Sequence, residues 1–203
     1  MSKYISTAEI AQHIDELAES DSREPMNVGD INSDKAGSGA RDNSGKPDWS
    51  LMPLYQLGWL AEIMTPGKRG VSLLVAAGRF QSKPTIKTAD ELLVESVKLL
   101  ESAKKHHSLI DTFSSVVPVW EYGLHKYAAW NWAKGMQWSV PLACLLRHLH
   151  GFSEGNDPES GQPHAAHIVC NAMMLRHFVE FYPKGNDMPT KWFGGSEVAV
   201  GDE

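Results

Sequence analysis

The spacing of apolar residues in this chain is helical rather than strand-like, and this feature constrains the fold most. The segment ELLVESVKLLESAKKHH (91–107) places Leu92, Leu93, Val97 and Leu100 on one helical stripe. No segment shows the apolar–polar alternation of a half-buried strand, and the sequence contains no internal repeat. We therefore predict an all-α domain built from short helices.

Capping residues and helix stops set the expected bounds of the other helices. Polar N-cap residues accept hydrogen bonds from the first turn, while Pro fits the start of a helix and Gly its end. On these signals Thr7 begins a helix, and residues 20–50, rich in Gly, Ser, Asp and Asn, form an extended arm. The remaining helices are expected at 51–64 with Ser50 as N-cap, from Thr88 or Asp90 onward, at 111–127 with Pro118 opening or interrupting it, at 140–152 after Ser139 with Gly151 as stop, and from Pro163 to about Tyr182.

Composition excludes several classes of partner. The 203 residues are 42% hydrophobic, which suits one domain with a core, and the net charge of −6 provides no basic surface for a nucleic-acid backbone. No apolar run approaches the roughly 18 residues that suggest a membrane span. Cys144 and Cys170 stand in apolar helical contexts, as reduced thiols of cytoplasmic proteins do. We therefore expect a cytoplasmic protein that binds neither nucleic acid nor membrane.

A Gly/Pro-rich stretch after residue 151 concentrates carboxylates. Glu154 and Asp157 are three residues apart and Glu159 follows them, so their side chains can share a hard cation if the chain turns back. Spacing of this kind is also common on solvated loops. The stretch therefore indicates either a metal site or a plain exposed loop.

Polar side chains recur at helical spacing just beyond these carboxylates. His164, His167 and Asn171 share one face of the helix that is expected to begin at Pro163. The face can supply metal ligands and a ligand contact, or it can hold histidines that are merely hydrogen-bonded at a helix start. A zinc site of Cys144 and His148 with His167 and Cys170 is conceivable, but ordinary buried thiols are favoured because the knuckle spacing is missing.

The segment VWEYGLHKYAAWNWAKG (119–135) combines acidic, basic and aromatic side chains. Glu121 and His125 are one helical turn apart, and Lys126 precedes an Asn131–Trp132 turn. A metal-bound nucleotide needs such a set, with Lys on phosphate and Trp near a base. The alternative is that the tryptophans at 120, 130, 132 and 138 are core anchors.

The glycine-rich segment GSGARDNSGK (37–46) can also take part in phosphate binding. Its backbone N–H groups can wrap phosphates, with Arg41 or Lys46 adding positive charge. It is not a Walker A motif, because the glycine spacing and the following Ser or Thr are absent, and by composition it is more often a linker. His-Asp, GxSxG and GxGxxG motifs are absent too, which disfavours several common nucleotide enzymes.

Three motifs in succession resemble the phage-encoded dATP/dGTP diphosphohydrolase family, which is distantly similar to all-α MazG-like nucleoside triphosphate pyrophosphohydrolases. They are GSGARDNSGKPDWSLMPL, VWEYGLHKYAAWNWAKG and LLRHLHGFSEGNDPESGQPHAAHIVCNAMML. The resemblance implies a MazG-like helical bundle with an extended N-terminal arm and a helical insert. On it we divide the chain into an N-terminal helix and mobile arm (1–36), one catalytic domain (37–193, insert about 68–112) and a tail (194–203).

The resemblance also implies an activity. The expected reaction is hydrolysis of purine deoxynucleoside triphosphates, dGTP and dATP, to the monophosphate and pyrophosphate with Mg²⁺ or Mn²⁺, supplying dGMP or depleting dATP in phage nucleotide metabolism. MazG-like chains usually form homo-oligomers, so we expect one here. The alternatives are a non-enzymatic phage protein with a structural metal site and a phosphohydrolase for another nucleotide.

MazG-like sites use Glu-x-x-Glu on one helix and Glu-x-x-Asp on the next. Glu154 and Asp157 match the second half, but Glu121 is followed three residues on by Leu124, so the first half is not matched. The ligand set is therefore Glu121 with Glu154 and Asp157, or one that draws on Glu159, His148, His164 or His167. Candidates to orient the attacking water are Glu121, Glu154 and a histidine such as His148. Candidates for substrate binding are Arg41, Lys46, Lys126, Asn131, Trp132, Lys134, Arg147 and Asn171, with Asn131 as the candidate reader of the base edge.

Overall fold

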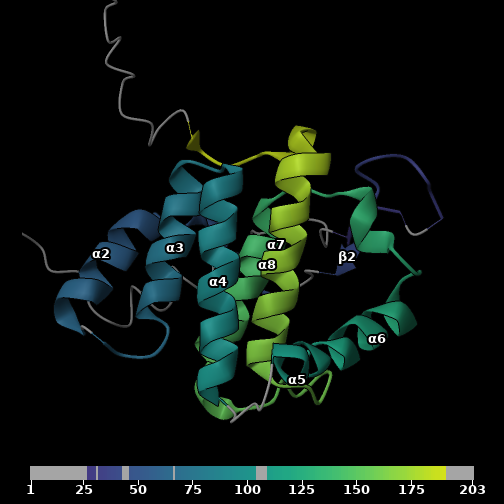
Figure 1. Cartoon of the computed structure of the whole chain (residues 1–203). Helices are drawn as coiled ribbons and strands as arrows, with labels where there is room; N and C mark the ends of the chain where they lie inside the picture. Colours follow the sequence, from purple (N-terminus) through teal and green to yellow (C-terminus); the bar gives the residue numbers. More distant parts are fainter. Residues whose placement is uncertain (1–26, 31, 43–45, 66, 104–108, 191–203) are drawn as a thin grey trace, which may run out of the picture.

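The computed structural model describes residues 27–30, 32–42, 46–65, 67–103 and 109–190. Within these ranges the chain is a helical bundle, which confirms the predicted all-α class (Figure 1). The helix expected at Thr7, most of the arm before residue 37 and the tail after residue 190 lie outside the described residues. No helix in the described part is long and apolar enough to cross a membrane.

The described part of the bundle consists of α-helices of 6 to 18 residues and four short turns of 3-10 helix. A two-residue antiparallel pair, β1 (Asn27–Val28) with β2 (Arg41–Asp42), is the only sheet in the described ranges. The helices are η1 (Trp49–Leu51), α2 (Leu54–Met64), α3 (Val71–Ser82), α4 (Ile86–Ala103), α5 (Leu109–Ser114), α6 (Val117–Lys126), η2 (Asn131–Lys134), α7 (Ser139–His150), η3 (Gly151–Glu154), α8 (His164–Phe181) and η4 (Pro183–Gly185).

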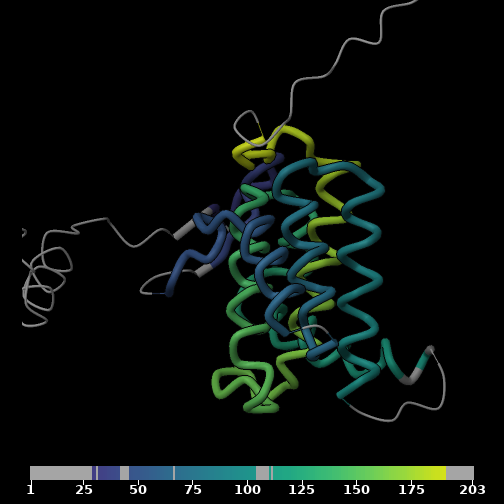
Figure 2. Tube along the Cα trace, turned by 90° about the vertical axis from the view of Figure 1, so that its left-hand side faces the viewer, coloured from purple at the N-terminus to yellow at the C-terminus, as the bar shows by residue number. Residues whose placement is uncertain are grey.

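Helix α8 is the central element of the bundle. It packs against α4 and α7, while α3 packs between α2 and α4 (Figures 1 and 2). Ile168, Leu175 and Phe178 on α8 are fully buried in the common core. Because α8 is buried on several sides, polar residues on it either find partners inside the protein or face a cavity.

Helix α3 was not expected from the sequence. Its apolar residues Leu73, Ala77 and Phe80 nonetheless recur at helical spacing and are buried in the core. Both α3 and α4 fall within residues 68–112, so this segment supplies part of the core of the bundle. The division of the chain into arm, domain, insert and tail remains a prediction.

Small residues let α2 and α3 approach closely. A Cβ atom added at Gly78 would lie 2.7 Å from the Cα atom of Tyr55, and one at Gly58 would lie 3.0 Å from the Cα atom of Val75. A larger residue at Gly78 would therefore push the two backbones apart, since backbone atoms cannot rotate out of the way.

Two of the expected caps are corrected by the structure. Ser50 does not cap α2, because Asp48 caps the preceding turn and accepts hydrogen bonds from the backbone N–H and hydroxyl of Ser50. Ser139 is the first residue of α7, and Asp187 accepts a hydrogen bond from its backbone N–H at 2.9 Å. The segment expected at 111–127 is divided into α5 and α6, and Pro118 lies in the first turn of α6. The expectations that Gly151 ends α7 and that a helix starts at Pro163 are confirmed.

The side chain of Tyr182 packs against two glycines, Gly37 and Gly135, and so helps to hold β2 next to η2. A Cβ atom at Gly135, where φ is +85°, would lie 2.3 Å from the ring of Tyr182, and one at Gly37 would lie 2.1 Å from its hydroxyl oxygen. The backbone N–H of Gly39 donates to the carbonyl of Gly135 at 2.9 Å. These contacts bring the segment around Arg41 to the side of the bundle where α6, α7 and α8 meet.

Candidate functional site

A cavity of about 650 Å³ opens between α6, η2, the C-terminal half of α7 and the N-terminal half of α8. The loop between η3 and α8 forms one edge of it, and β2 reaches in from the N-terminal side. The cavity lining includes most of the predicted site residues, namely Arg41, Lys46, Glu121, Lys126, Asn131, Trp132, Arg147, His148, Asp157, Glu159, His164, His167 and Asn171. Glu154 and Lys134 are not among its lining residues.

The predicted polar face of α8 exists, and α7 contributes a third imidazole to it. His164, His167 and Asn171 are buried on one side of α8. The ring of His148 on α7 stacks on that of His167, with centroids 4.2 Å apart, and its Nδ1 atom lies 3.0 Å from Nδ1 of His164. Gly151 makes room for this, because a Cβ atom there would lie 2.7 Å from the His164 ring.

Asp157 is held rigidly beside these rings. Its Oδ2 atom accepts hydrogen bonds from the backbone N–H and hydroxyl of Ser160 at 2.9 and 2.8 Å. The Ser160 hydroxyl is also 2.7 Å from Nε2 of His167, which itself lies 3.8 Å from Oδ2 of Asp157. Burial opposes ionisation of Asp157, but the hydrogen bonds from Ser160 and the nearby imidazoles outweigh it, so the pKa of Asp157 is lowered.

The side chains of His148, Asp157 and His164 converge closely enough to hold a metal ion. One ligand atom from each lies within 4.8 Å of the others. The Nε2 atom of His164 is buried and has no hydrogen-bond partner among the described residues. Burial lowers the pKa of His164 and of His167, with the neighbouring His148 adding to the effect, which favours the neutral imidazole that metals bind.

This donor set fits some of the expected ions better than others. Mg²⁺ prefers oxygen ligands and usually keeps several waters, whereas imidazole nitrogens suit transition metals. Two imidazoles and one carboxylate therefore fit Mn²⁺ better than Mg²⁺. The residues that would hold the ion are His148, Asp157 and His164.

Glu159, which the sequence suggested as a metal ligand, instead pairs with basic side chains. Its carboxylate accepts hydrogen bonds from Lys126, from Lys46 at 3.3 Å and from the Tyr122 hydroxyl at 3.0 Å. The hydrogen bond from Lys126 is the main reason that the pKa of Glu159 falls to about 2, and the same bond raises the pKa of Lys126. Glu159 thus lies between two ammonium groups from different segments, and all of these residues line the cavity.

The thiol of Cys144 lies beside a cation, which speaks against a zinc site. The Arg41 guanidinium donates to Sγ of Cys144 at 2.6 Å and to Oδ1 of Asn171 at 2.9 Å. Burial alone would raise the pKa of Cys144, but Arg41, His148 and Arg147 lower it to about 5. Cys170 is a free thiol whose pKa burial raises to about 12. The preference for buried thiols over a Cys/His zinc site is consistent with this arrangement.

Asn131 is not placed to read a base. Its Oδ1 atom accepts from the backbone N–H of Ala40 at 3.1 Å, and its Nδ2 atom donates to the carbonyl of Ala40 at 3.0 Å. The side chain is 4% exposed, so its amide serves to pin β2 to η2. Two backbone N–H groups of the glycine-rich segment already have partners. Those of Gly37 and Gly39 donate to the backbone carbonyls of Lys134 and Gly135, so they are not open to phosphate.

Tryptophans form an aromatic wall of the cavity. Trp132 packs between Trp120 and His177, with ring centroids at 5.0 and 4.9 Å. Trp130 lies 6.1 Å from Trp132 and is 73% exposed. Trp138 is buried in the core and matches the alternative that some of the tryptophans are core anchors.

The remaining predicted residues divide between the cavity and the surface. Glu121 is exposed on α6 and lines the cavity, and Arg147 donates to the carbonyl of Pro47 at 3.1 Å at its edge. Glu154 is exposed at the end of η3, and its charge acts on His164. Because Glu154 is not part of the cavity lining, the Glu154–Asp157 pair does not converge on the cavity. Lys134 stands outside the lining.

Ser160 and Tyr122 are site residues that the sequence reasoning missed. Ser160 follows Asp157 by three residues, which is the spacing of a local side-chain turn and could have been found. Tyr122 adjoins Glu121 on α6, but its contact with Glu159 spans 37 residues and has no local signal.

The fold and the site define an all-α protein with a cavity between α6, η2, α7 and α8. Its lining contains three side chains able to hold a metal ion, several basic side chains and an aromatic wall. Residues 102–188 match the family model described as dATP/dGTP diphosphohydrolase, N-terminal. This segment, less than half of the chain, is thus similar to the dATP/dGTP diphosphohydrolase family, a family of hydrolases by name, which its motifs also resemble. The match contains all cavity-lining residues except Ala40, Arg41 and Lys46. No curated protein and no solved structure matches the chain at a significant level.

Proposed function

We propose that this protein hydrolyses dGTP and dATP to the monophosphate and pyrophosphate in a reaction that depends on a divalent metal ion. The family supports action on purine deoxynucleotides. The further steps of the proposal are that the protein is MazG-like and phage-encoded, that it acts in the host cytoplasm, and that it supplies dGMP or depletes dATP in phage nucleotide metabolism.

The observation that carries the proposal is the meeting of His148, Asp157 and His164 with Lys46 and Lys126 in one cavity. A triphosphate is strongly anionic, whereas this chain has a net charge of −6, so binding requires cations between the two. A divalent ion held by the triad, together with the ammonium groups of Lys46 and Lys126 on the same lining, would supply that charge. The aromatic wall offers a surface for the base.

The residues of the cavity divide the work of the reaction. Bound by His148, Asp157 and His164, a divalent ion would neutralise phosphoryl oxygens and lower the pKa of an attacking water. Ser160, whose hydroxyl lies 2.7 Å from Nε2 of His167, holds Asp157 in one orientation. Glu121, an exposed carboxylate on the lining, is the candidate to orient the water toward the α-phosphorus.

Basic side chains bind the leaving pyrophosphate in this proposal. Lys46 and Lys126 now share the Glu159 carboxylate, and the β- and γ-phosphates of a substrate would replace that carboxylate as their partner. Arg147 lies at the same cavity and adds a third cation. Arg41, held by Asn171 and Cys144, is the cation at the buried end.

A second copy of the chain is proposed to cover α2. This helix packs on α3 at the side of the bundle away from α6 (Figure 1). Its remaining surface exposes Tyr55, Trp59, Leu60, Ile63 and Met64, and the turn before it exposes Leu51 and Met52. A contiguous face of exposed large apolar side chains marks an interaction site. We therefore propose a homo-oligomer that buries this face, as standard interfaces do with roughly 800 Å² per partner.

A panel of deoxynucleoside triphosphates tests the proposal. Each is incubated with the full chain and Mn²⁺ or Mg²⁺, and monophosphate, diphosphate, nucleoside and pyrophosphate are resolved. We expect dGMP and dAMP with pyrophosphate, and no product in EDTA. A tightly held metal without turnover would favour a structural metal site instead, and turnover of other nucleotides alone would favour another phosphohydrolase.

The Asp157→Asn variant places the activity in this cavity. It removes a ligand charge at nearly constant shape and should lower turnover at least about a hundredfold. Its matched control is Glu101→Gln, a charge removal on the exposed side of α4 that should leave turnover unchanged.

A further inference from the structure

Trp130 has a backbone conformation that its residue type disfavours. Its φ and ψ are 60° and 13°, and it is the only non-glycine residue with positive φ in the described part of the chain. Asn and Asp enter this left-handed region with modest cost, but a bulky side chain there is an outlier. Such strain persists only where the surroundings fix it, and it clusters at functional sites.

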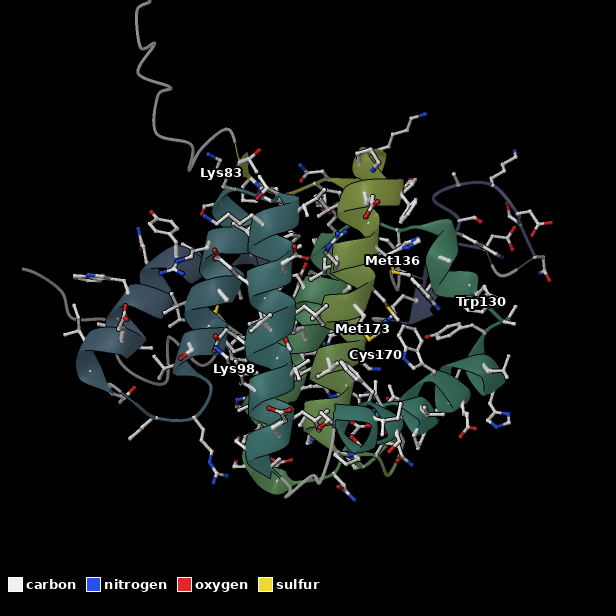
Figure 3. The ribbon with its side chains drawn as sticks, in the orientation of Figure 1. Lys83, Lys98, Trp130, Met136, Cys170 and Met173 are labelled. Carbon is white, nitrogen blue, oxygen red and sulfur yellow. The ribbon has the colours of Figure 1, made fainter. Side chains whose placement is uncertain are left out.

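Burial does not account for the strained tryptophan. The Trp130 side chain is 73% exposed, yet it lines the cavity. In Figure 3 it projects at the right-hand edge of the molecule, on the α6 side of α8, the same side as Cys170 and Met173. A tryptophan that served only to pack the core would be buried. The exposed position of Trp130 on the cavity instead favours contact with a ligand.

The turn around Trp130 is fixed from both sides. The N–H of Asn131 donates to the carbonyl of Ala128 at 3.1 Å, and the N–H of Ala133 donates to the carbonyl of Trp130 at 2.9 Å. Asn131 is pinned in turn to Ala40 through both ends of its amide. The backbone therefore fixes the direction in which this side chain, which lines the cavity, leaves the chain.

The neighbouring tryptophan is less available to a ligand. Trp132 is contacted by Trp120 and by His177, with ring centroids at 5.0 and 4.9 Å. Trp130 contacts Trp132 at 6.1 Å with planes inclined by 46° and otherwise stands open to the cavity and solvent. The exposed ring is thus Trp130, with Trp132 as its support.

We propose that Trp130 is the stacking surface for the purine base and a determinant of purine over pyrimidine selection. The inference rests on the proposed function, because it assumes a nucleotide in this cavity. An indole offers a flat two-ring face, and a purine covers more of it than a pyrimidine does. The constrained turn keeps the ring in place before the ligand arrives, so little conformational freedom is lost on binding.

Substitutions at one position separate stacking from backbone strain. Trp130→Phe keeps an aromatic face, whereas Trp130→Asn and Trp130→Gly remove it and relieve the left-handed strain. The measured quantity is the ratio of kcat/KM for dGTP to kcat/KM for dCTP. Stacking is worth enough to expect about a tenfold fall in dGTP binding for the Asn and Gly variants, with a smaller loss for dCTP. Trp130→Phe should retain most of the ratio.

Ile110→Asn is the matched control, since it removes an equally exposed large apolar side chain, on α5, that does not line the cavity. It should leave the ratio unchanged. Two results would overturn the inference: a ratio that survives in Trp130→Asn and Trp130→Gly, or a ratio that falls as far in Trp130→Phe as in Trp130→Asn.

A binding measurement separates this inference from the reaction itself. Isothermal titration of the full chain with dGMP and dCMP in EDTA does not require turnover. Stronger binding of dGMP that is lost in Trp130→Asn supports the stacking role even if no triphosphate is hydrolysed. Equal binding by wild type and Trp130→Asn contradicts the stacking role even if hydrolysis proceeds as proposed.

Discussion

The Nδ1 atoms of His148 and His164 lie 3.0 Å apart, although one residue comes from α7 and the other from α8. Asp157 places a carboxylate oxygen in the same small volume, within 4.8 Å of both imidazoles. Three ligand atoms from three segments therefore converge where the helices cross. This convergence is the geometric basis for the metal site in the proposed function.

Asp157→Asn should lower turnover at least about a hundredfold with little change in melting temperature, because metal chemistry depends on the ligand charge while the amide keeps the shape. Steady-state rates at limiting metal and thermal melting curves check this. Near-wild-type turnover at limiting metal would show that the loop between η3 and α8 is only a solvated turn.

Glu154→Gln should behave differently from Asp157→Asn. The sequence treats Glu154 and Asp157 as a pair, but Glu154 is exposed and stands outside the cavity lining. We expect its turnover to stay within a few-fold of wild type, measured in the same assay. A loss as large as that of Asp157→Asn would mean that Glu154 reaches the metal in the working enzyme.

Asn131→Ala should destabilise the fold rather than relax base selection. The substitution leaves the buried backbone N–H and carbonyl of Ala40 without their partners, which costs about 1–3 kcal/mol. Urea denaturation measures the free energy of unfolding, and the dGTP-to-dCTP ratio measures selection. A stable variant with a reduced ratio would return Asn131 to the role of base reader.

Cys144 should react with iodoacetamide in preference to Cys170 between pH 6 and 8. A thiol whose pKa is lowered to about 5 is already ionised above that pH, so its alkylation rate should change little across this range. The thiol of Cys170, with a pKa of about 12, stays protonated. Mass spectrometry of the labelled peptides checks the preference, and Arg41→Met, which removes the neighbouring cation, should restore a rate that rises with pH.

Local periodicity was enough to predict the polar face of α8. His164, His167 and Asn171 share that face because their spacing is helical, and Pro163 and Gly151 mark the adjoining helix ends. The all-α class followed from the same periodicity. These features depend on neighbours in sequence, so a single sequence contains them.

Long-range contacts account for what the sequence did not predict. Asn131 meets Ala40 across 91 residues, and Glu159 meets Lys46 across 113, so no local pattern indicates either pair. The stacking of His148 on His167 depends on how α7 crosses α8. The left-handed backbone of Trp130 was not predicted for another reason. This conformation is expected at Gly, Asn or Asp, and a tryptophan gives no sign of it.

Hydrolysis in water enriched in oxygen-18 tests the central claim most directly. The full chain is incubated with dGTP and Mn²⁺, and the products are analysed by mass spectrometry. The account predicts dGMP that carries the label and pyrophosphate that does not, because water attacks the α-phosphorus. Label in pyrophosphate, release of nucleoside with intact triphosphate, or unchanged turnover in EDTA would contradict it.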